Sequence, residues 1–323
     1  MQIDFCYHIR IPNFEQFLIS PMTPEYSVKP DRLIQHGEKE IASFLLRGTA
    51  NIDEETVKSF GEEWQEFNIF SEVEISNAGD EYFDLVTEKM VNKKSIVLDL
   101  GCGSGRWSYY LADRVAHIEA LDPSNAVFPA SQLLASKQNV RVSQASADAI
   151  PFQDNTFDFM MSLGVLHHIP DTQKALNDAV KKLKPGGYLL LYLYYNLDNR
   201  GPIYRLLFHL SDMLRNAISA LPTGVKKLTC NLIAVFIYMP FILLARLVRS
   251  ITPGKTYLKM PLAYYSNKSF HIVRNDALDR FGTPLEQRFS KAEISEMCMA
   301  AGLEEIQFSD KMPYWHLTAC KKA

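Results

Sequence analysis

Glycines and an acid at the end of an apolar segment are the first residues of this chain that could do chemistry. In "VLDLGCGSGRW", Asp99 precedes Gly101, Gly103 and Gly105. A glycine-rich turn between a strand and a helix lets the backbone approach a nucleotide-like ligand closely. A dinucleotide-binding turn, G-x-G-x-x-G, would need its third glycine at position 106, where this chain has Arg106. Because the glycine comes one residue early, at Gly105, the turn disfavours a nicotinamide-dependent dehydrogenase.

More polar residues follow the next strands that the pattern predicts. Asp122 ends the strand in "HIEALDPS", 19 residues after Gly103. A carboxylate there can accept hydrogen bonds from both hydroxyls of a ribose, although nicotinamide enzymes also use an acid in a similar place. Asp148 lies in "ADAIPF" after the third strand, and the pair His167 and His168 follows the fourth.

The order of these motifs resembles that of the class I, Rossmann-like S-adenosylmethionine-dependent methyltransferases, in particular bacterial enzymes that act on small molecules. The resemblance covers about residues 55–196 and 286–323. It implies S-adenosyl-L-methionine as the cofactor, with the glycine turn under its methionine part and ribose, and Asp148 and Ala149 at its adenine. The segment "SFGEEWQEF" is similar to one that helps to roof the cofactor in some members. The cofactor-binding residues that the resemblance implies are Asp99, Gly101, Cys102, Gly103, Asp122, Pro123, Asp148, Ala149, Leu163 and Trp64.

Candidates for acid–base or orienting roles follow the fourth and fifth predicted strands. Methyl transfer is an in-line displacement at a carbon bonded to a sulfonium, and it needs a general base only if the acceptor still carries its proton. His167 and His168 are the first candidates, and in an extended segment only one of two neighbours is expected to face a pocket. Tyr195 and Asn196, with Tyr194, are expected at the mouth of that pocket. A structural interpretation stays open for each: a hydrogen-bonded core histidine, or packing under an insertion.

Strands and helices alternate in a way that predicts right-handed crossovers and a parallel sheet. The expected fold class is α/β: a doubly wound, mostly parallel, seven-stranded sheet of class I methyltransferase type, with an N-terminal extension and a helical cap inserted after the fifth strand. The expected domains are an N-terminal arm at 1–52, a cofactor-binding core at 53–196, an apolar helical insertion at 197–285, and a C-terminal part at 286–323 that completes the sheet.

The insertion contains 18 residues without a charge, Leu228 to Ala245, which reaches the lower limit for a membrane span. The strands before and after it are expected in one sheet, so a single crossing would put half of that sheet across the bilayer. Two interpretations remain. One is a substrate lid whose apolar face packs on the catalytic domain or serves a homodimer. The other is peripheral membrane contact through 228–249, with headgroups near Lys226, Lys227, Arg246 and Arg249.

Composition counts against several classes of protein. The net charge is -3, from 34 Lys and Arg and 37 Asp and Glu, which lacks the basic footprint of a nucleic-acid-binding protein. Five cysteines stand singly without a CxxC pair, so neither a metal site nor a disulfide framework is expected. The opening residues, "MQIDFCYHIRIPNFEQF", mix charges with apolar residues, unlike a secretory signal. We expect a cytoplasmic protein that binds no nucleic acid.

Three functions are consistent with these patterns. The first is methyl transfer to a small-molecule acceptor, such as a natural-product precursor or a glycan or lipid precursor. The second keeps the cofactor but cyclises its aminocarboxypropyl chain and releases methylthioadenosine, so that the cofactor itself is the substrate. The third is a non-catalytic cofactor-binding or membrane-associated partner protein. The acceptor, the attacking atom and the oligomeric state have no signature in the sequence.

Overall fold

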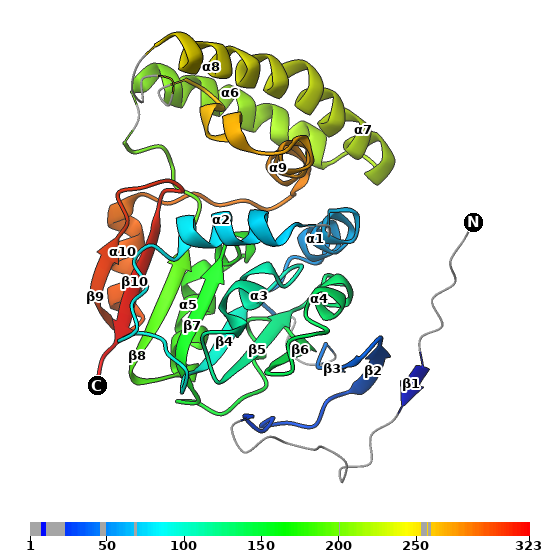
Figure 1. Cartoon of the computed structure of the whole chain (residues 1–323), viewed down its shortest axis with the longest axis vertical. Helices are drawn as coiled ribbons and strands as arrows, with labels where there is room; N and C mark the ends of the chain where they lie inside the picture. Colours follow the sequence, from blue (N-terminus) through cyan, green and yellow to red (C-terminus); the bar gives the residue numbers. More distant parts are fainter. Residues whose placement is uncertain are drawn as a thin grey trace. The chain divides into compact units, whose positions relative to one another are not determined.

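The computed structural model describes residues 8–10, 23–45, 50–67, 70–199, 201–252, 257 and 260–323 (Figure 1). The chain divides into two compact units. The first, here the core unit, comprises Met1–Asp198 and Leu285–Ala323, and the second, the helical unit, comprises Asn199–Pro284.

One mixed sheet forms the centre of the core unit. Its strands are β1 His8–Arg10, β2 Arg32–His36, β3 Lys39–Ser43, β4 Ile96–Leu100, β5 His117–Asp122, β6 Val140–Gln144, β7 Phe157–Leu163, β8 Leu183–Tyr192, β9 Leu303–Phe308 and β10 His316–Lys321. They lie in the order β1-β2-β3-β6-β5-β4-β7-β8-β10-β9. The six strands of the series β3-β6-β5-β4-β7-β8 are all parallel to one another. Strand β10 is antiparallel to both β8 and β9. The mostly parallel, doubly wound sheet is confirmed.

The expected count of seven strands is wrong for the sheet as a whole. The described part of the chain contributes ten strands, because β1, β2 and β3 extend the sheet beyond β6. The hairpin of β2 and β3 is antiparallel, and Ala42 of β3 pairs in parallel with Ser143 of β6. Tyr26 ties the preceding segment to the same edge, since its hydroxyl lies 2.6 Å from Ser143 Oγ and its ring lies 4.0 Å from the Arg141 guanidinium. Residues 23–45 therefore belong to the core and are not a separate arm.

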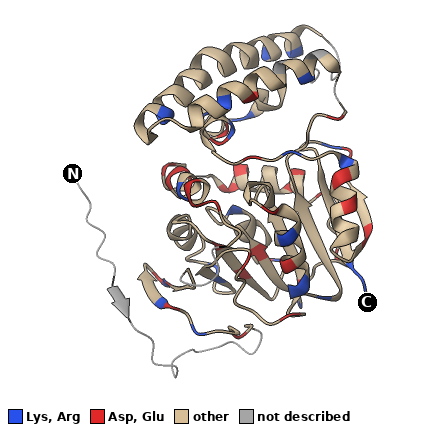
Figure 2. Cartoon of the chain, turned by 180° about the vertical axis from the view of Figure 1, so that it is seen from behind, with Lys and Arg blue, Asp and Glu red and all other residues tan. Residues whose placement is uncertain are grey.

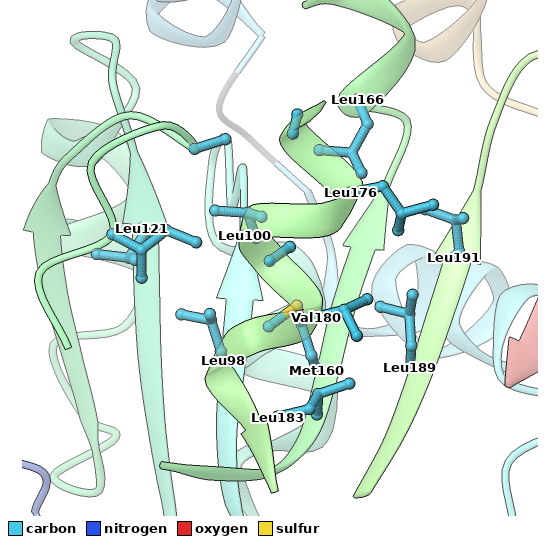
Figure 3. Close-up of a cluster of buried hydrophobic side chains, with 14 of the residues drawn as sticks. Leu98, Leu100, Leu121, Met160, Leu166, Leu176, Val180, Leu183, Leu189 and Leu191 are labelled. Carbon is cyan, nitrogen blue, oxygen red and sulfur yellow. The ribbon is translucent and has the colours of Figure 1, made fainter. Parts of the chain in front are cut away.

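Alternate side chains of the central strands pack on opposite faces of the sheet. Leu98 and Leu100 of β4 join Met160 of β7 and Val180 of α5 (Thr172–Lys182) in one buried cluster (Figure 3). Val97, which precedes Leu98 and points to the opposite face, belongs to a second cluster that also contains residues of α3 (Arg106–Ala112) and α4 (Val127–Leu133). Helices thus cover both faces, as the alternation of elements predicts.

Three further helices complete the core unit. The predicted helix after Asp53 is α1 (Glu54–Glu66), and the Asp53 carboxylate caps it by accepting from Thr56 N at 2.8 Å. Helix α2 (Glu72–Tyr82) begins at a capping box formed by Ser71 and Glu74. Near the C-terminus, α10 (Lys291–Ala300) precedes β9 and β10.

The described part of the helical unit holds four α-helices. They are α6 (Pro202–Ser219), α7 (Thr223–Ile233), α8 (Met239–Ile251) and α9 (Phe270–Gly282). A π-helical turn, Ala234–Tyr238, joins α7 to α8, so one continuous helix runs from Thr223 to Ile251. Pro240 follows this wider turn, which accommodates a residue that has no N–H.

This continuous helix meets the length and composition of a membrane span. It has 29 residues, its most apolar window has a mean hydropathy of 2.2, and 33% of that window is buried inside the protein. Soluble proteins can also contain such helices, so a lid and a membrane contact both stay predictions for this unit.

Candidate active site

A cavity opens at the carboxyl ends of β4, β5 and β7 in the core unit, the edge where ligands bind in doubly wound sheets. The empty space within it is about 900 Å³, including the open space where it meets solvent. Of the ten residues expected to bind the cofactor, seven line this cavity: Gly101, Cys102, Gly103, Asp122, Pro123, Leu163 and Trp64.

The glycine turn forms the floor of the cavity because its backbone takes conformations that other residues avoid. Gly101 has φ +80°, and a Cβ atom on it would lie 2.4 Å from the methyl groups of Val165. Gly105 has φ +83° and is the N-cap residue of α3. The early third glycine therefore starts this helix in the left-handed region, where a side chain would be strained.

Asp122 connects the turn to the end of β5. Its Oδ2 accepts from Gly103 N at 2.9 Å, and its Oδ1 accepts from Ser124 N at 2.8 Å and Ser124 Oγ at 2.6 Å. Burial raises the pKa of Asp122, and the hydrogen bonds from Ser124 and Gly103 oppose that rise. The carboxylate is thus held in one orientation at the cavity wall. Its Oδ1 already accepts two hydrogen bonds, and its Oδ2 has a second lone pair for a ligand.

Asp99 is buried behind the turn and does not line the cavity. It is 1% exposed, and its Oδ2 accepts from Ser108 Oγ at 2.7 Å. Burial raises its pKa to about 7; the Ser108 hydroxyl opposes this shift, and the charge of Asp122 adds to it. The structure gives Asp99 a place under the glycine turn, without a cavity-facing atom.

Aromatic rings of α1 and its neighbours face the glycine turn. The Nε1 atom of Trp64 lies 3.1 Å from the point where a Cβ on Gly103 would be. The Arg106 guanidinium lies 5.2 Å from the Trp64 ring centroid and 4.5 Å from that of Trp107. Arg106 thus packs among aromatic rings at the place where a dinucleotide-binding turn would have its third glycine.

The expected adenine residues are next to the cavity but do not line it. Asp148 Oδ2 accepts from Asn51 N at 3.1 Å, and Ser146 Oγ donates to its other oxygen. The N–H of Ala149, expected to reach the adenine ring, donates to the Ser146 carbonyl at 3.1 Å. Ser146 and Ala147, two residues earlier in the chain, line the cavity instead. The structure therefore places Asp148 and Ala149 outside the lining, each with a hydrogen bond within the loops.

His167 and His168 lie in a 3-10 turn, Leu166–His168, so the expectation of an extended segment is wrong. Their rings stay together, with centroids 4.1 Å apart, and both side chains are almost fully buried. His168 lines the cavity, and its Nδ1 lies 2.7 Å from the Leu285 carbonyl oxygen. Because a carbonyl oxygen only accepts, that nitrogen donates. The Nε2 atom of His168 has less than 1 Å² of accessible surface.

His167 is not part of the cavity wall. It is 0% exposed, stacks on Tyr194 at 3.9 Å between centroids, and neither ring nitrogen has a hydrogen-bond partner among the described residues. Burial, and then the positive charges of His168 and Arg288, hold the pKa of His167 well below its ordinary value. A neutral ring packed in this way fits the structural interpretation of His167.

Tyr195 and Asn196 also lie outside the cavity lining, contrary to the place expected for them. The Tyr195 ring packs against Tyr314 and its backbone forms a bridge with Phe289. Asn196 N donates to the Phe289 carbonyl at 3.0 Å, and its side-chain oxygen accepts from Asp198 N at 3.1 Å. These contacts hold the segment that follows β8 against the segment that returns to the core unit at 285–289.

The returning segment at 285–289 is a part of the site that sequence reasoning missed. Leu285 N donates to Thr56 Oγ1 at 3.1 Å, while its carbonyl holds His168. Gln287 N donates to the His167 carbonyl at 3.0 Å. Thr56 and Phe60 of α1 line the cavity as well, and the helical spacing of the apolar residues in α1 was the signal that could have found Phe60.

The chain is similar to methyltransferases over its central part. Residues 98–191 match a family described as methyltransferase domain. The chain is 36% identical over 102 residues to phosphoethanolamine N-methyltransferase 2 of Caenorhabditis elegans, covering 30% of this chain and 23% of that protein. It is 32% identical over 105 residues to demethylmenaquinone methyltransferase of Listeria monocytogenes serotype 4a, covering 31% of this chain and 44% of that protein.

The match thus spans less than half the length of either curated relative. Among solved structures, human N-acetylserotonin methyltransferase in complex with its cofactor is similar with a TM-score of 0.48 and 16% identity, over 82% of this chain and 57% of that chain.

Proposed function

We propose that this chain transfers a methyl group from S-adenosylmethionine to a small-molecule acceptor, because its core unit is a class I S-adenosylmethionine-dependent methyltransferase domain. The two curated relatives are named for small compounds, phosphoethanolamine and demethylmenaquinone. We extend the proposal to a natural-product, glycan or lipid precursor as the acceptor. Cys102, Cys298 and Cys320 are buried and form no disulfide among the described residues, which supports a reducing compartment such as the cytosol.

The residues of the cavity fit S-adenosylmethionine. Asp122 is a buried carboxylate whose Oδ2 can accept from a ribose hydroxyl, and Gly101 and Gly103 leave room that a Cβ would fill. The rings of Trp64 and Phe60 supply aromatic surface beside this cradle. Ser146 and Ala147 would meet the adenine, in place of the side chain of Asp148 and the N–H of Ala149.

One observation carries the proposal: the cofactor-binding groups and His168 share a single cavity within the core unit. Of the four residues expected to act on the acceptor, His168 alone is in its wall, since His167, Tyr195 and Asn196 are absent from the lining among the described residues. The acceptor would therefore meet His168 and the aromatic residues of α1.

The bound cofactor supplies an activated methyl group, so the residues of this chain mainly align the acceptor and exclude water. We assign His168 to positioning the acceptor and not to removing its proton, because its Nε2 is covered by protein atoms. The bond from Nδ1 to Leu285 keeps the ring in one orientation. This assignment favours an acceptor whose attacking lone pair is already free, such as a neutral amine or an ionised oxygen.

The test of the function is product analysis after incubation of the full chain with S-adenosylmethionine, first alone and then with a cell extract. The proposal expects S-adenosylhomocysteine, formed only when extract supplies an acceptor. Methylthioadenosine without extract would favour cyclisation of the cofactor's own side chain. Absence of cofactor binding in a calorimeter would contradict both enzymatic functions and leave the non-catalytic partner.

The test of the positioning role is a His168→Gln variant, with His209→Gln on the exposed surface of the helical unit as the matched control. The change at His168 should raise KM for the acceptor and lower kcat by less than about tenfold, with the cofactor affinity kept. A fall of about 100-fold or more in kcat, with loss of the acidic limb of the pH profile, would instead make His168 the general base.

A further inference from the structure

Charge is divided unevenly between the two units. Residues 199–284 hold twelve Lys and Arg and three Asp, a net formal charge of +9. The rest of the chain holds 22 Lys and Arg and 34 Asp and Glu, a net of -12, and the two values together give the -3 of the whole chain. Figure 2 shows the same contrast, with acidic residues numerous in the core unit and sparse on the helices of the helical unit.

Two of the three acids of the helical unit, Asp212 and Asp276, have partners within that unit. Asp212 lies 2.9 Å from Arg215 and 3.4 Å from Arg280. Asp276 is half-buried and accepts a hydrogen bond from the Tyr265 hydroxyl. The continuous helix Thr223–Ile251 contains no acid at all.

That helix exposes an apolar face along its whole length. Its buried side, which includes Cys230, Ile233, Ile242 and Ala245, faces the interior of the unit, where α7 packs on α9. On the other side, six large apolar side chains that are 47% to 71% exposed recur at intervals of four or seven residues: Leu228, Leu232, Phe236, Leu243, Leu247 and Ile251. We call these six residues the apolar face.

Basic residues stand at both ends of the uncharged stretch and none within it. Lys226 and Lys227 precede Leu228, and Arg246 and Arg249 follow Ala245. Both arginines are in the exposed class. Long basic side chains at the ends of an apolar helix surface can reach lipid headgroups while the apolar residues enter the acyl boundary.

We propose that the apolar face of the helical unit binds the surface of an anionic lipid bilayer, with the long helix lying in the plane of the interface. A net charge of +9 is attracted to anionic headgroups, and a bilayer is a partner that covers large apolar side chains without a specific complementary shape. A second copy of the same face would bring two units of +9 together, and their repulsion opposes such a dimer.

The topology of the chain favours a helix that lies on the membrane over one that crosses it. The helical unit leaves the core unit after β8 and returns before β10, and these two strands pair in one sheet, so the number of crossings must be even. One described helix alone qualifies as a span. Helix α6, the first element of the unit, carries Arg205, Asp212 and Arg215, which are costly in a hydrocarbon core.

This inference goes beyond methyl transfer and does not depend on it. The experiment is co-sedimentation of the full chain with vesicles of phosphatidylcholine alone, and with vesicles that also contain phosphatidylglycerol, at low and high salt. We expect binding to the phosphatidylglycerol vesicles at low salt, weakening as salt rises, and little binding to phosphatidylcholine alone. Because the readout is sedimentation, an inactive protein leaves the test intact.

Two variants place the contact on the apolar face. Phe236→Glu and Leu228→Glu, at side chains 71% and 60% exposed, should each lower the partition coefficient about tenfold or more. Val73→Glu is the matched control, since Val73 is 67% exposed on α2 of the core unit. It should bind vesicles like the unmodified chain. Circular dichroism checks that each variant keeps its helices.

Several results would overturn the proposal. Equal binding to both vesicle types would remove the anionic lipid as the partner. Loss of binding in Val73→Glu to the same degree as in Phe236→Glu would remove the apolar face as the contact. A chain that stays in the supernatant with all vesicles would show that the apolar face does not bind a bilayer. A dimer that Phe236→Glu abolishes would show that a second copy of the chain covers this face.

Discussion

Replacing Asp99 by asparagine should stabilise the core unit at pH 8 and leave it nearly unchanged near pH 4. Asp99 is 1% exposed beneath the glycine turn, and burial raises its pKa from 3.8 to about 7. The folded protein therefore holds a proton on Asp99 that the unfolded chain gives up above about pH 4. The stability that this raised pKa contributes is full below pH 4 and is lost as pH rises toward 7. Asparagine is neutral at every pH and can still accept from Ser108.

The size of the effect follows from the shift. A difference of about 3 pKa units at 1.36 kcal/mol per unit corresponds to about 4 kcal/mol of unfolding free energy. The advantage of Asp99→Asn over the unmodified chain should grow from near zero at pH 4 to about 4 kcal/mol above pH 7. For a unit of this size the melting temperatures would then differ by on the order of 10 °C.

Urea unfolding at several pH values, followed by tryptophan fluorescence, measures this difference. Trp64, Trp107 and Trp315 are the three tryptophans of the chain, and all lie in the core unit, so the signal reports that unit alone. Asp113→Asn is the control, because the Asp113 side chain is 77% exposed and its effect should not vary in this way. An advantage of Asp99→Asn that is the same at pH 5 and pH 8 would refute the reasoning.

Three other changes test the site. Gly101→Ala would place a Cβ 2.4 Å from the Val165 methyl groups, at a residue with φ +80°. Cofactor binding should therefore be lost and the melting temperature should fall. Gly201→Ala is the control: a Cβ there has no atom within 4 Å, so neither quantity should change. Asp122→Asn cannot accept from both backbone N–H groups that its carboxylate now binds, and it loses the charge-assisted bond of Oδ2 to a ribose hydroxyl. Calorimetry should show a Kd about 100-fold higher, and a change below threefold would count against the ribose role. His167→Phe removes two buried nitrogens without partners and keeps the ring stack, so stability by thermal melting should hold or rise; a loss above about 2 kcal/mol would show that the imidazole has a polar role.

The parts of the fold that sequence reasoning predicted have local signals. Strands β4 to β8 read as short apolar runs, and the turns after them carry glycine, proline or acids, so Gly101, Gly103 and Asp122 could be placed at one edge of the sheet. The helix from Asp53 was predicted from its acidic first turn and apolar spacing, and this brought Trp64 to the cavity.

The parts that were missed depend on contacts between distant segments. Pairing of Ala42 with Ser143 joins residues a hundred positions apart, and nothing local to "KEIAS" specifies it. The 3-10 turn at His167 is stabilised by a segment near Gln287, beyond the whole insertion. The contacts of Tyr195 and Asn196 with Phe289 also join distant segments, and nothing near these two residues in the sequence indicates them. Both residues were therefore expected in the cavity, whereas they lie beside the returning chain.

The bridge between Tyr195 and Phe289 has a consequence for how this protein can be taken apart. The two points where the insertion leaves and rejoins the core are neighbours, joined by the hydrogen bond from Asn196 to Phe289. Excision of Asn199–Pro284 therefore asks only for a short linker across a gap that the core already closes. Leu285 sets the limit of such an excision, since a shortened protein that retains it keeps the carbonyl that orients His168. Residues 199–284 are thus a removable insertion, and the core unit has a natural minimal form.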